Sequence, residues 1–231
     1  MNNKKNVRIV RVKVKKRKFK IKKIFFLLVF IVLICCSFKF LNSIPLKNIV
    51  IIGNDVLLEQ KIIEDLKLEN YPSYLSIKKS NLESLLKKNP LVDKVTVKKD
   101  FFNRKVTISI KEEELLFIYN NKVILSSFEE IDNDNYSIAV VSNYIDKDYY
   151  ESFIKAYNKI DSNIRDLVSE IKYIPNEVDK ERFLLYLTDS NQIYMTISKI
   201  DNVNNYIDLK SKVGDNKGSF HLDSGTYFER G

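Results

Sequence analysis

The stretch NPLVDKVTVKKDFFNRKVTISIKE, residues 89–112, contains two segments in which apolar and polar side chains alternate. A period of two puts the apolar side chains of a segment on one face, so alternation predicts a half-buried β-strand. A loop at residues 100–104 separates the two segments. We expect two consecutive strands, and their inward-facing residues are Val95 and Val97 in the first and Val106, Ile108 and Ile110 in the second.

Two segments with helical spacing precede these strands. Apolar residues recur at every fourth position from residue 58 to residue 66, which predicts a helix that starts near Asp55. The sequence SNLE at residues 80–83 has the form of a capping box, in which the first and last side chains satisfy backbone amides of the first turn. It predicts a second helix, which Asn89-Pro90 ends.

A run of β-branched residues at 49–52, followed by the turn signal Gly53-Asn54, predicts a further strand before the helices. The resulting order is β-α-α-β-β, which places two helices on one face of a three-stranded sheet. The edges of such a sheet have unpaired backbone groups. Either a partner strand adds to an edge or the next domain covers it, and the sequence leaves both alternatives open.

Residues 24–41 form an apolar run that predicts a transmembrane helix. Eighteen residues at 1.5 Å each span roughly 27 Å, close to the thickness of the hydrocarbon core. The alternative is a cleaved signal peptide, but the preceding region is long and no small-residue cleavage site follows. Cys35 and Cys36 lie inside this run, so the sequence outside it contains no cysteine for a disulfide.

The positive charge of the chain is concentrated at the N-terminus. Residues 1–23 contain 12 Lys or Arg and no acidic residue, whereas the rest of the chain has a net charge of −3. This distribution argues against a DNA-binding domain and predicts a cytoplasmic N-terminus with the folded part outside the membrane. The tail is either a topology signal alone or also a contact for anionic headgroups.

Residue types that serve catalysis or metal binding are scarce. The chain has one histidine, His221, and no cysteine outside the apolar run, so a zinc site or a Cys-His pair is not expected. Phosphate-binding and dinucleotide-binding glycine motifs are absent from the sequence. We expect no catalytic residue, no cofactor-binding residue and no metal ligand. The acidic run at residues 112–114 is interpreted as a solvated domain joint.

The residues from 115 onward read as strand-rich with helices between the strands. Asn120-Asn121 predicts a hairpin, and the turn at residues 189–191 predicts a second one. Residues 148–167 could hold one helix, and a shorter helix is expected to begin near Ile200, with residues 206–209 near its end. Strand pieces at residues 219–222 and 226–228 are expected to end the chain.

The N-terminal half resembles a known family. The basic tail, the single apolar helix and the order β-α-α-β-β with Gly53-Asn54, Asn89-Pro90-Leu91-Val92 and a strand ending at Glu112 resemble the FtsQ/DivIB family of bacterial cell-division proteins. The first module is similar to the POTRA domain of that family. Phe102 stands in a loop where the family usually has proline, and Leu115-Leu116 stands where proline often follows the strand.

The C-terminal half resembles the same family in two segments. YIDLK at residues 206–210 looks like its YxDLR-type motif, with Lys210 in place of arginine, so the bidentate contact of an arginine is lost. GSFHLDSGTYF at residues 218–228 is similar to its terminal strand region, which the resemblance implies pairs with a partner by strand addition. The residues to which this role is assigned are Ser219, Phe220, His221, Leu222, Tyr227 and Phe228.

The alternative is that Phe220 and Leu222 belong to the core and that Tyr227 and Phe228 cap it. His221 is expected to be a surface side chain of the strand and not a catalytic group. Aromatic side chains and an extended edge suit a binding surface, because they offer large contact area and free backbone groups.

The sequence thus predicts an α+β protein in four parts: a basic tail (1–23), a transmembrane helix (24–41), a POTRA-like domain (42–114) and a mixed, strand-rich C-terminal domain (115–231). The resemblance implies a non-enzymatic scaffold of the division machinery at the septum, in the cytoplasmic membrane with its bulk outside. Its implied partners are bitopic proteins of the FtsB/DivIC and FtsL type and, through them, the septal peptidoglycan synthase, with no nucleic acid and no cofactor. The alternatives are a membrane-anchored extracellular sensor and a membrane-anchored cell-wall hydrolase.

Overall fold

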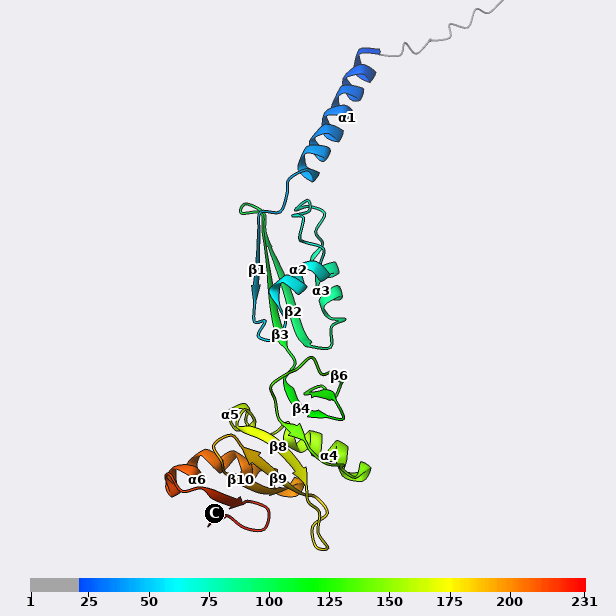
Figure 1. Cartoon of the computed structure of the whole chain (residues 1–231). Helices are drawn as coiled ribbons and strands as arrows, with labels where there is room; N and C mark the ends of the chain where they lie inside the picture. The colour runs from blue at the N-terminus through cyan, green and yellow to red at the C-terminus, as the bar shows by residue number, and fades with distance from the viewer. Residues whose placement is uncertain (1–20) are drawn as a thin grey trace, which may run out of the picture.

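The structure is a computed structural model that describes residues 21–231, so the basic tail lies almost wholly outside the described residues. The chain forms an elongated molecule in which an N-terminal helix, a three-stranded sheet and a nine-stranded sheet follow one another (Figure 1). The C-terminus lies at the end opposite to the N-terminal helix (Figure 1). The mixed α+β class that the sequence predicted is confirmed.

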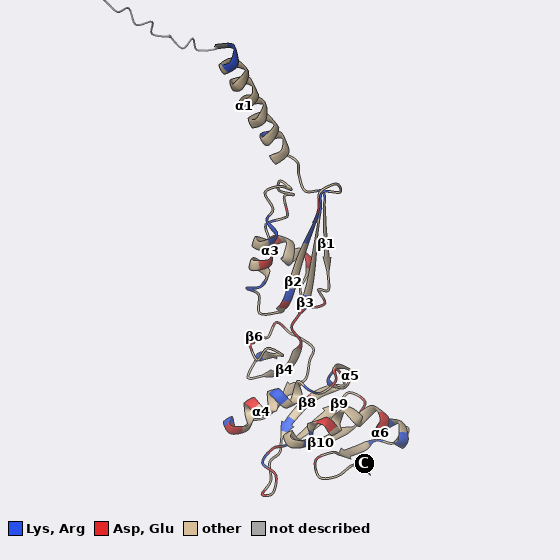
Figure 2. Ribbon diagram, turned by 180° about the vertical axis from the view of Figure 1, so that it is seen from behind, with Lys and Arg blue, Asp and Glu red and all other residues tan. Residues whose placement is uncertain are grey.

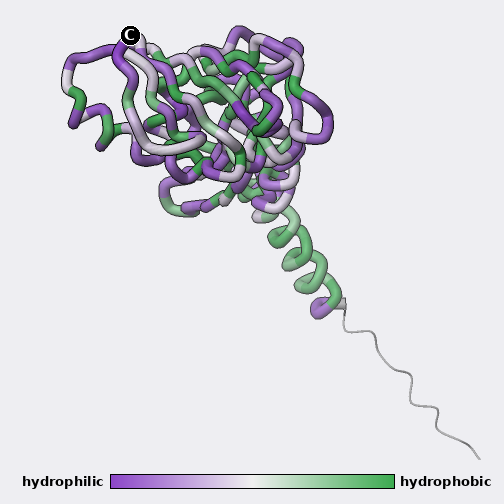
Figure 3. The backbone as a smooth tube through the Cα atoms, turned by 90° about the horizontal axis from the view of Figure 1, so that it is seen from below, coloured by the Kyte–Doolittle hydropathy of each residue, from purple (hydrophilic) through white to green (hydrophobic). Residues whose placement is uncertain are grey.

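Helix α1 (Ile21–Asn42) contains the apolar run. The segment from Lys22 to Asn42 is long and apolar enough to cross a membrane. None of the residues in its apolar window is buried in the structure. Figure 3 shows the helix hydrophobic along most of its length. Helix α1 starts three residues before the predicted span and ends one residue after it.

The first globular part has the predicted order β-α-α-β-β. Strand β3 lies in the middle of the sheet, parallel to β1 and antiparallel to β2. The inward-facing residues predicted for β2 and β3, Val106 and Ile108 among them, are all buried. The elements are β1 (Asn48–Ile52), α2 (Glu59–Asp65), α3 (Lys79–Leu86), β2 (Val92–Asp100) and β3 (Lys105–Glu112).

Two local predictions for these helices are wrong. Helix α2 begins at Glu59 and not near Asp55, because residues 53–58 form a loop that the Glu112 carboxylate caps. The capping box at the start of α3 does not form. The helix is capped without a side-chain hydrogen bond, and the Glu83 carboxylate instead accepts a hydrogen bond of 2.9 Å from the backbone amide of Val97 in β2.

The second globular part is built on nine strands in the order β12-β11-β10-β9-β8-β7-β4-β5-β6. Both predicted hairpins are present, and Asn120 and Asn121 have positive φ angles, as a tight turn between twisted strands requires. The strands are β4 (Leu115–Tyr119), β5 (Lys122–Leu125), β6 (Glu130–Asp132), β7 (Val140–Val141), β8 (Val168–Tyr173), β9 (Arg182–Leu187), β10 (Gln192–Thr196), β11 (Gly218–His221) and β12 (Tyr227–Arg230).

The helices of this part differ from the prediction. The segment 148–167 forms two helices, α4 (Lys147–Tyr157) and α5 (Ser162–Arg165), separated by a turn at residues 158–161. The helix expected from near Ile200 is two consecutive helices, the 3₁₀ helix η1 (Ile197–Asn205) and α6 (Tyr206–Val213), so the segment 206–209 begins a helix and does not lie near the end of one. All four helices contribute residues to one core with the sheet.

The hairpin β4–β5 belongs to two cores. Phe117 and Ile124 lie in the core of the second part, together with helix α4. Ile118, Val123 and Leu125 lie in one cluster with the buried residues of the first part. Figure 1 shows β4 and β6 on the side of the second part that is nearest to the three-stranded sheet. The two globular parts therefore share buried side chains.

Candidate partner-binding surface

The terminal strands form one end of the nine-stranded sheet. Strand β11 pairs in parallel with β10, and β12 pairs antiparallel with β11. Gly218 lets these strands approach closely, because a Cβ atom at this position would lie 2.1 Å from the carbonyl oxygen of Glu229. Strand β12 is last in the order, so its outer backbone edge faces away from the sheet.

The structure divides the six predicted contact residues into two groups. Phe220 and Leu222 are each 1% exposed and lie in the core, so their side chains are not offered to a partner. The alternative that left them in the core describes these two correctly. Tyr227 is 53% exposed, and Phe228 and Ser219 are partly exposed. Phe228 packs on Phe220, with ring centroids 4.8 Å apart.

His221 is not the surface side chain that we expected, because it is only 9% exposed. Its ring is stacked between the rings of Tyr194 and Tyr227, at centroid distances of 4.5 and 4.4 Å. Its Nε2 atom lies 3.1 Å from the Glu229 carboxylate. The imidazole therefore joins three neighbouring strands through ring stacking.

The stack continues on the far side of Tyr194. The Arg182 guanidinium lies 4.6 Å from the centre of that ring and donates a 2.6 Å hydrogen bond to Asp223. Burial alone would raise the pKa of Asp223, but the hydrogen bonds from Arg182 and from the Ser224 amide hold it below its ordinary value. Asp223 thus remains ionised. Its hydrogen bonds with Arg182 and with the Ser224 amide hold the turn that follows β11.

A small apolar pocket lies beside β12. It has a volume of about 200 Å³ and is lined by residues of α6 and of both terminal strands, among them Val213, Phe220 and Phe228. Lys212 also lines this pocket. The pocket would therefore lie next to an apolar side chain of a strand that paired with β12.

The YIDLK segment is connected to the first residue of β11 through hydrogen bonds in the turn between β9 and β10. Tyr206 is fully buried, and its hydroxyl donates a 2.6 Å hydrogen bond to the Asp189 carboxylate and accepts one of 3.0 Å from Asn191. The Asn191 side-chain oxygen accepts a hydrogen bond from the backbone amide of Gly218, the first residue of β11. Lys210 lies 3.6 Å from Asp189, an ion pair without a hydrogen bond.

Sequence reasoning missed this network because its polar members lie far apart in the chain. The turn signal at residues 189–191 and the tyrosine of the motif were both visible, but their contact was not.

The acidic run at the joint also has a role that we did not predict. The Glu112 carboxylate accepts hydrogen bonds from the backbone amides of three successive residues, 55–57, at distances of 3.1, 2.7 and 2.8 Å. Glu113 accepts one from Ser126, and Glu114 pairs with Arg165. These carboxylates therefore link segments on both sides of the joint and are more than a solvated spacer.

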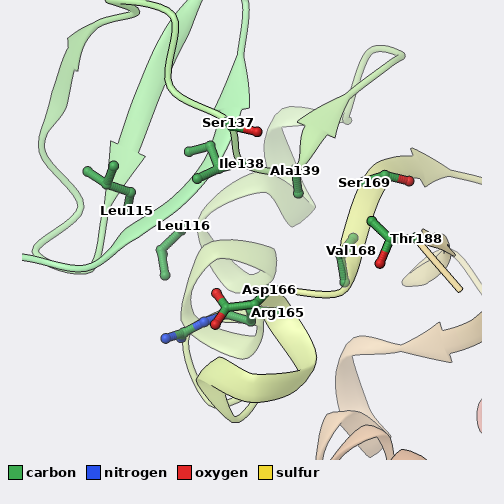
Figure 4. Close-up of a pocket in the computed structure, with 10 residues that line it drawn as sticks. All are labelled: Leu115, Leu116, Ser137, Ile138, Ala139, Arg165, Asp166, Val168, Ser169 and Thr188. Carbon is green, nitrogen blue, oxygen red and sulfur yellow. The ribbon is translucent and has the colours of Figure 1, made fainter. Parts of the chain in front are cut away.

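A second pocket, of about 460 Å³, lies near this joint (Figure 4). Arg165 and Asp166 line it at the end of α5, with Ser137 and Ile138 above them and Ser169 and Thr188 to the right in this view. Its lining residues include no histidine or cysteine that could activate a hydroxyl group. Within the described residues, no group of three or more His, Cys, Asp or Glu side chains is placed to hold a metal ion.

Residues 44–113 match the family model of the FtsQ-type POTRA domain. Curated relatives extend the similarity over most of the chain. The DivIB cell division protein of Listeria monocytogenes is 25% identical over 217 residues, which are 87% of this chain and 78% of the relative. The DivIB protein of Bacillus subtilis is 24% identical over 216 residues, 89% of this chain and 81% of the relative.

One solved structure is similar at lower coverage. It is the major extracytoplasmic domain of the trans isomer of DivIB from Geobacillus stearothermophilus. It has 15% identity and a TM-score of 0.37, and it covers 44% of this chain and 93% of that chain.

The fold and the family model together define a POTRA-domain protein with an N-terminal apolar helix and a strand-rich C-terminal domain. The resemblance of the chain to the FtsQ/DivIB family, which the sequence indicated, is confirmed by these matches.

Proposed function

We propose that this chain is a non-enzymatic scaffold of bacterial cell division, held in the cytoplasmic membrane and binding other division proteins outside it. The names of the relatives, which are cell division proteins, support the division role. The polar side chains at and beside the terminal strands support the non-enzymatic role, since His221, Arg182 and Asp223 are all engaged in packing or ion pairing.

The proposed topology is a single pass with a cytoplasmic N-terminus. Helix α1 has the length for it, and the 12 basic residues of segment 1–23 precede it. The POTRA domain (42–114) and the C-terminal domain (115–231) then lie on the outer face, at the septum. The proposed boundary falls between β3, which ends at Glu112, and β4, which begins at Leu115.

The exposed edge of β12 is the observation that carries the binding proposal. A strand from a bitopic protein of the FtsB/DivIC or FtsL type would extend the sheet there, and these proteins would connect the chain to the septal peptidoglycan synthase. Tyr227 and Phe228 would contact the partner directly. Ser219, Phe220 and His221 would hold β12 in place through backbone pairing and packing, and Leu222 would hold the end of β11 on β10.

Affinity capture from membranes tests the proposal. The full chain is compared with a variant that ends at Thr226, which removes β12 but keeps the core residues Phe220 and Leu222. The Tyr227→Ala variant removes only an exposed ring. Tyr144→Ala is the matched control, because Tyr144 is 65% exposed in a loop before α4.

We expect the full chain and the Tyr144→Ala control to retain small bitopic division proteins, while the shortened chain loses them and Tyr227→Ala retains less. Equal capture by all four chains would show that β12 is not the binding site and that partners bind another surface. If the full chain retains no division protein, the scaffold proposal fails.

A further inference from the structure

The segment that joins α1 to the POTRA domain is fixed between two loops at one end of that domain. The Leu46 amide donates to the carbonyl of Pro72 (2.9 Å), and the Tyr74 amide donates to the carbonyl of Ile44 (2.9 Å). On the other side, the Lys47 amide donates to the carbonyl of Arg104 (2.9 Å). The loops at residues 67–78 and 101–104 therefore lie at the α1 end of the domain, as Figure 1 shows.

The distance from this end of the domain to the helix is short. Helix α1 ends at Asn42, and Ile44 is already hydrogen-bonded to the first loop. Two residues of extended chain reach at most about 7 Å. The loops thus lie at the level of the membrane surface whenever α1 spans the bilayer.

Large apolar side chains are exposed on both loops. Phe102 is 94% exposed, and Phe101 is 52% exposed in the same turn. On the first loop, Tyr71 and Leu75 are 51% and 39% exposed. Exposed aromatic rings at this depth are typical of residues that enter the headgroup region of a bilayer.

The turn that carries the two phenylalanines is held in place. Asp100 accepts hydrogen bonds from the backbone and side chain of Asn103, at 3.1 and 2.6 Å. The Phe101 ring packs edge-on against Tyr74 at 5.9 Å, and Lys99 donates hydrogen bonds to the carbonyls of Tyr74 and Ile77 at 2.7 and 2.6 Å. A preformed turn loses little conformational entropy when it enters an interface.

Basic residues surround this end. Lys47 and Lys78 are exposed, and Arg104 is partly exposed, so their charges lie near the level of lipid phosphates. Figure 2 shows basic positions along the strands that lead to this end. Cations near an anionic membrane surface are attracted to it.

We propose that the Phe101-Phe102 turn, together with Tyr71 and Leu75, inserts into the headgroup region of the outer membrane leaflet and seats the POTRA domain on the lipid surface. The inference rests on the proposed anchoring by α1. It assigns a second membrane contact to the chain, made by the globular part and separate from the transmembrane helix. The occupant of this surface is lipid, because the two-residue connection leaves no room for a protein layer between helix and domain.

Tryptophan reporters in the full chain test the proposal, because the natural sequence has no tryptophan. Phe102→Trp places the reporter in the turn. Val178→Trp is the exposed control, since Val178 is 97% exposed in the loop between β8 and β9, far from α1 (Figure 1). Phe30→Trp places a reporter within α1. Each variant is reconstituted into vesicles of phosphatidylcholine and anionic phosphatidylglycerol, with or without brominated acyl chains, and folding is checked by circular dichroism.

The Phe102→Trp emission should shift to shorter wavelength in vesicles and should be quenched most by bromines near the headgroups. Phe30→Trp should be quenched most by bromines deep in the chains, and Val178→Trp should not be quenched. If Phe30→Trp is quenched while Phe102→Trp behaves like Val178→Trp, the seating proposal is wrong and the anchoring stands. If Phe30→Trp is not quenched, the anchoring itself fails, and the seating proposal fails with it.

Discussion

The hydroxyl of Tyr206 donates a 2.6 Å hydrogen bond to the carboxylate of Asp189, although 17 residues separate them. The bond connects the start of α6 to the turn between β9 and β10. Asn191, in the same turn, holds the first residue of β11 through its side-chain oxygen. The buried hydroxyl of Tyr206 therefore helps to position Gly218, where the terminal strands begin. The position of the proposed binding edge depends on it.

Replacement of Tyr206 by phenylalanine should lower the free energy of unfolding by about 1 kcal/mol, because it removes one hydrogen bond from Asp189 and one from Asn191. Urea unfolding of the full chain in detergent, followed by circular dichroism, measures the change. Tyr144→Phe, at an exposed position, should leave the midpoint unchanged. A Tyr206→Phe midpoint equal to that of the unaltered chain would show that the network adds no stability.

Gly53 is the position in the POTRA domain where a side chain is least tolerated. Its φ angle is +81°, and a Cβ atom would lie 2.2 Å from the carbonyl oxygen of Ile110. Gly53→Ala should therefore destabilise the domain by more than the roughly 1–2 kcal/mol of an unfavourable φ angle alone. Gly225→Ala is the control, because its Cβ would make only an ordinary 3.6 Å contact with Tyr227. Thermal unfolding should separate the two variants, and equal melting temperatures would contradict the argument.

Glu112→Gln should also destabilise the POTRA domain. The carboxylate uses both oxygens to accept bonds from the amides of residues 55–57, whereas an amide has one acceptor and directs an NH₂ group at a donor. The expected loss is about 1–3 kcal/mol. Hydrogen exchange should show faster opening of the loop before α2. Glu177→Gln, in an exposed loop, serves as the control and should exchange like the unaltered chain.

The C-terminal domain should lose stability in acid. Burial alone would raise the pKa of Asp189, but hydrogen bonds from Tyr206 and Asn191 hold it below the ordinary 3.8, and Asp223 is likewise lowered. The folded state then binds fewer protons than the unfolded state. This stabilisation is complete above the ordinary pKa and is lost as the pH falls towards the folded pKa.

Urea midpoints at roughly pH 6 and pH 3 measure this loss. Asp223→Asn should be less stable at the higher pH and should depend less on pH than the unaltered chain. An identical pH dependence in both chains would mean that Asp223 does not contribute.

The POTRA fold could be predicted from the sequence because local patterns decide it. Alternation in residues 92–112 fixed which side chains of β2 and β3 are buried, and the tight turns at Gly53 and Asn120-Asn121 marked where strands end. The capping box failed for a physical reason. Glu83 reaches a strand amide across the helix–sheet interface, and a long-range hydrogen bond replaces the local one.

The binding surface was less predictable than the fold. Phe220, His221 and Leu222 follow one another in a strand, and alternation would put His221 opposite to its neighbours, in solvent. Instead it is covered by Tyr227 of β12 and Tyr194 of β10, which lie on the same face. Cross-strand pairing of this kind depends on register, and the sequence alone does not reveal which strands are neighbours.

The shared hairpin β4–β5 has a consequence for partners. Because its side chains belong to two cores, the POTRA domain and the C-terminal sheet lack a freely moving hinge between them. If α1 spans the bilayer as proposed, the height of β12 above the bilayer is then constant, set by the two sheets that follow one another along the molecule. A membrane-anchored partner can add a strand there only if its own stalk reaches that height. Under the proposed function, the chain would therefore select partners by length as well as by side-chain fit.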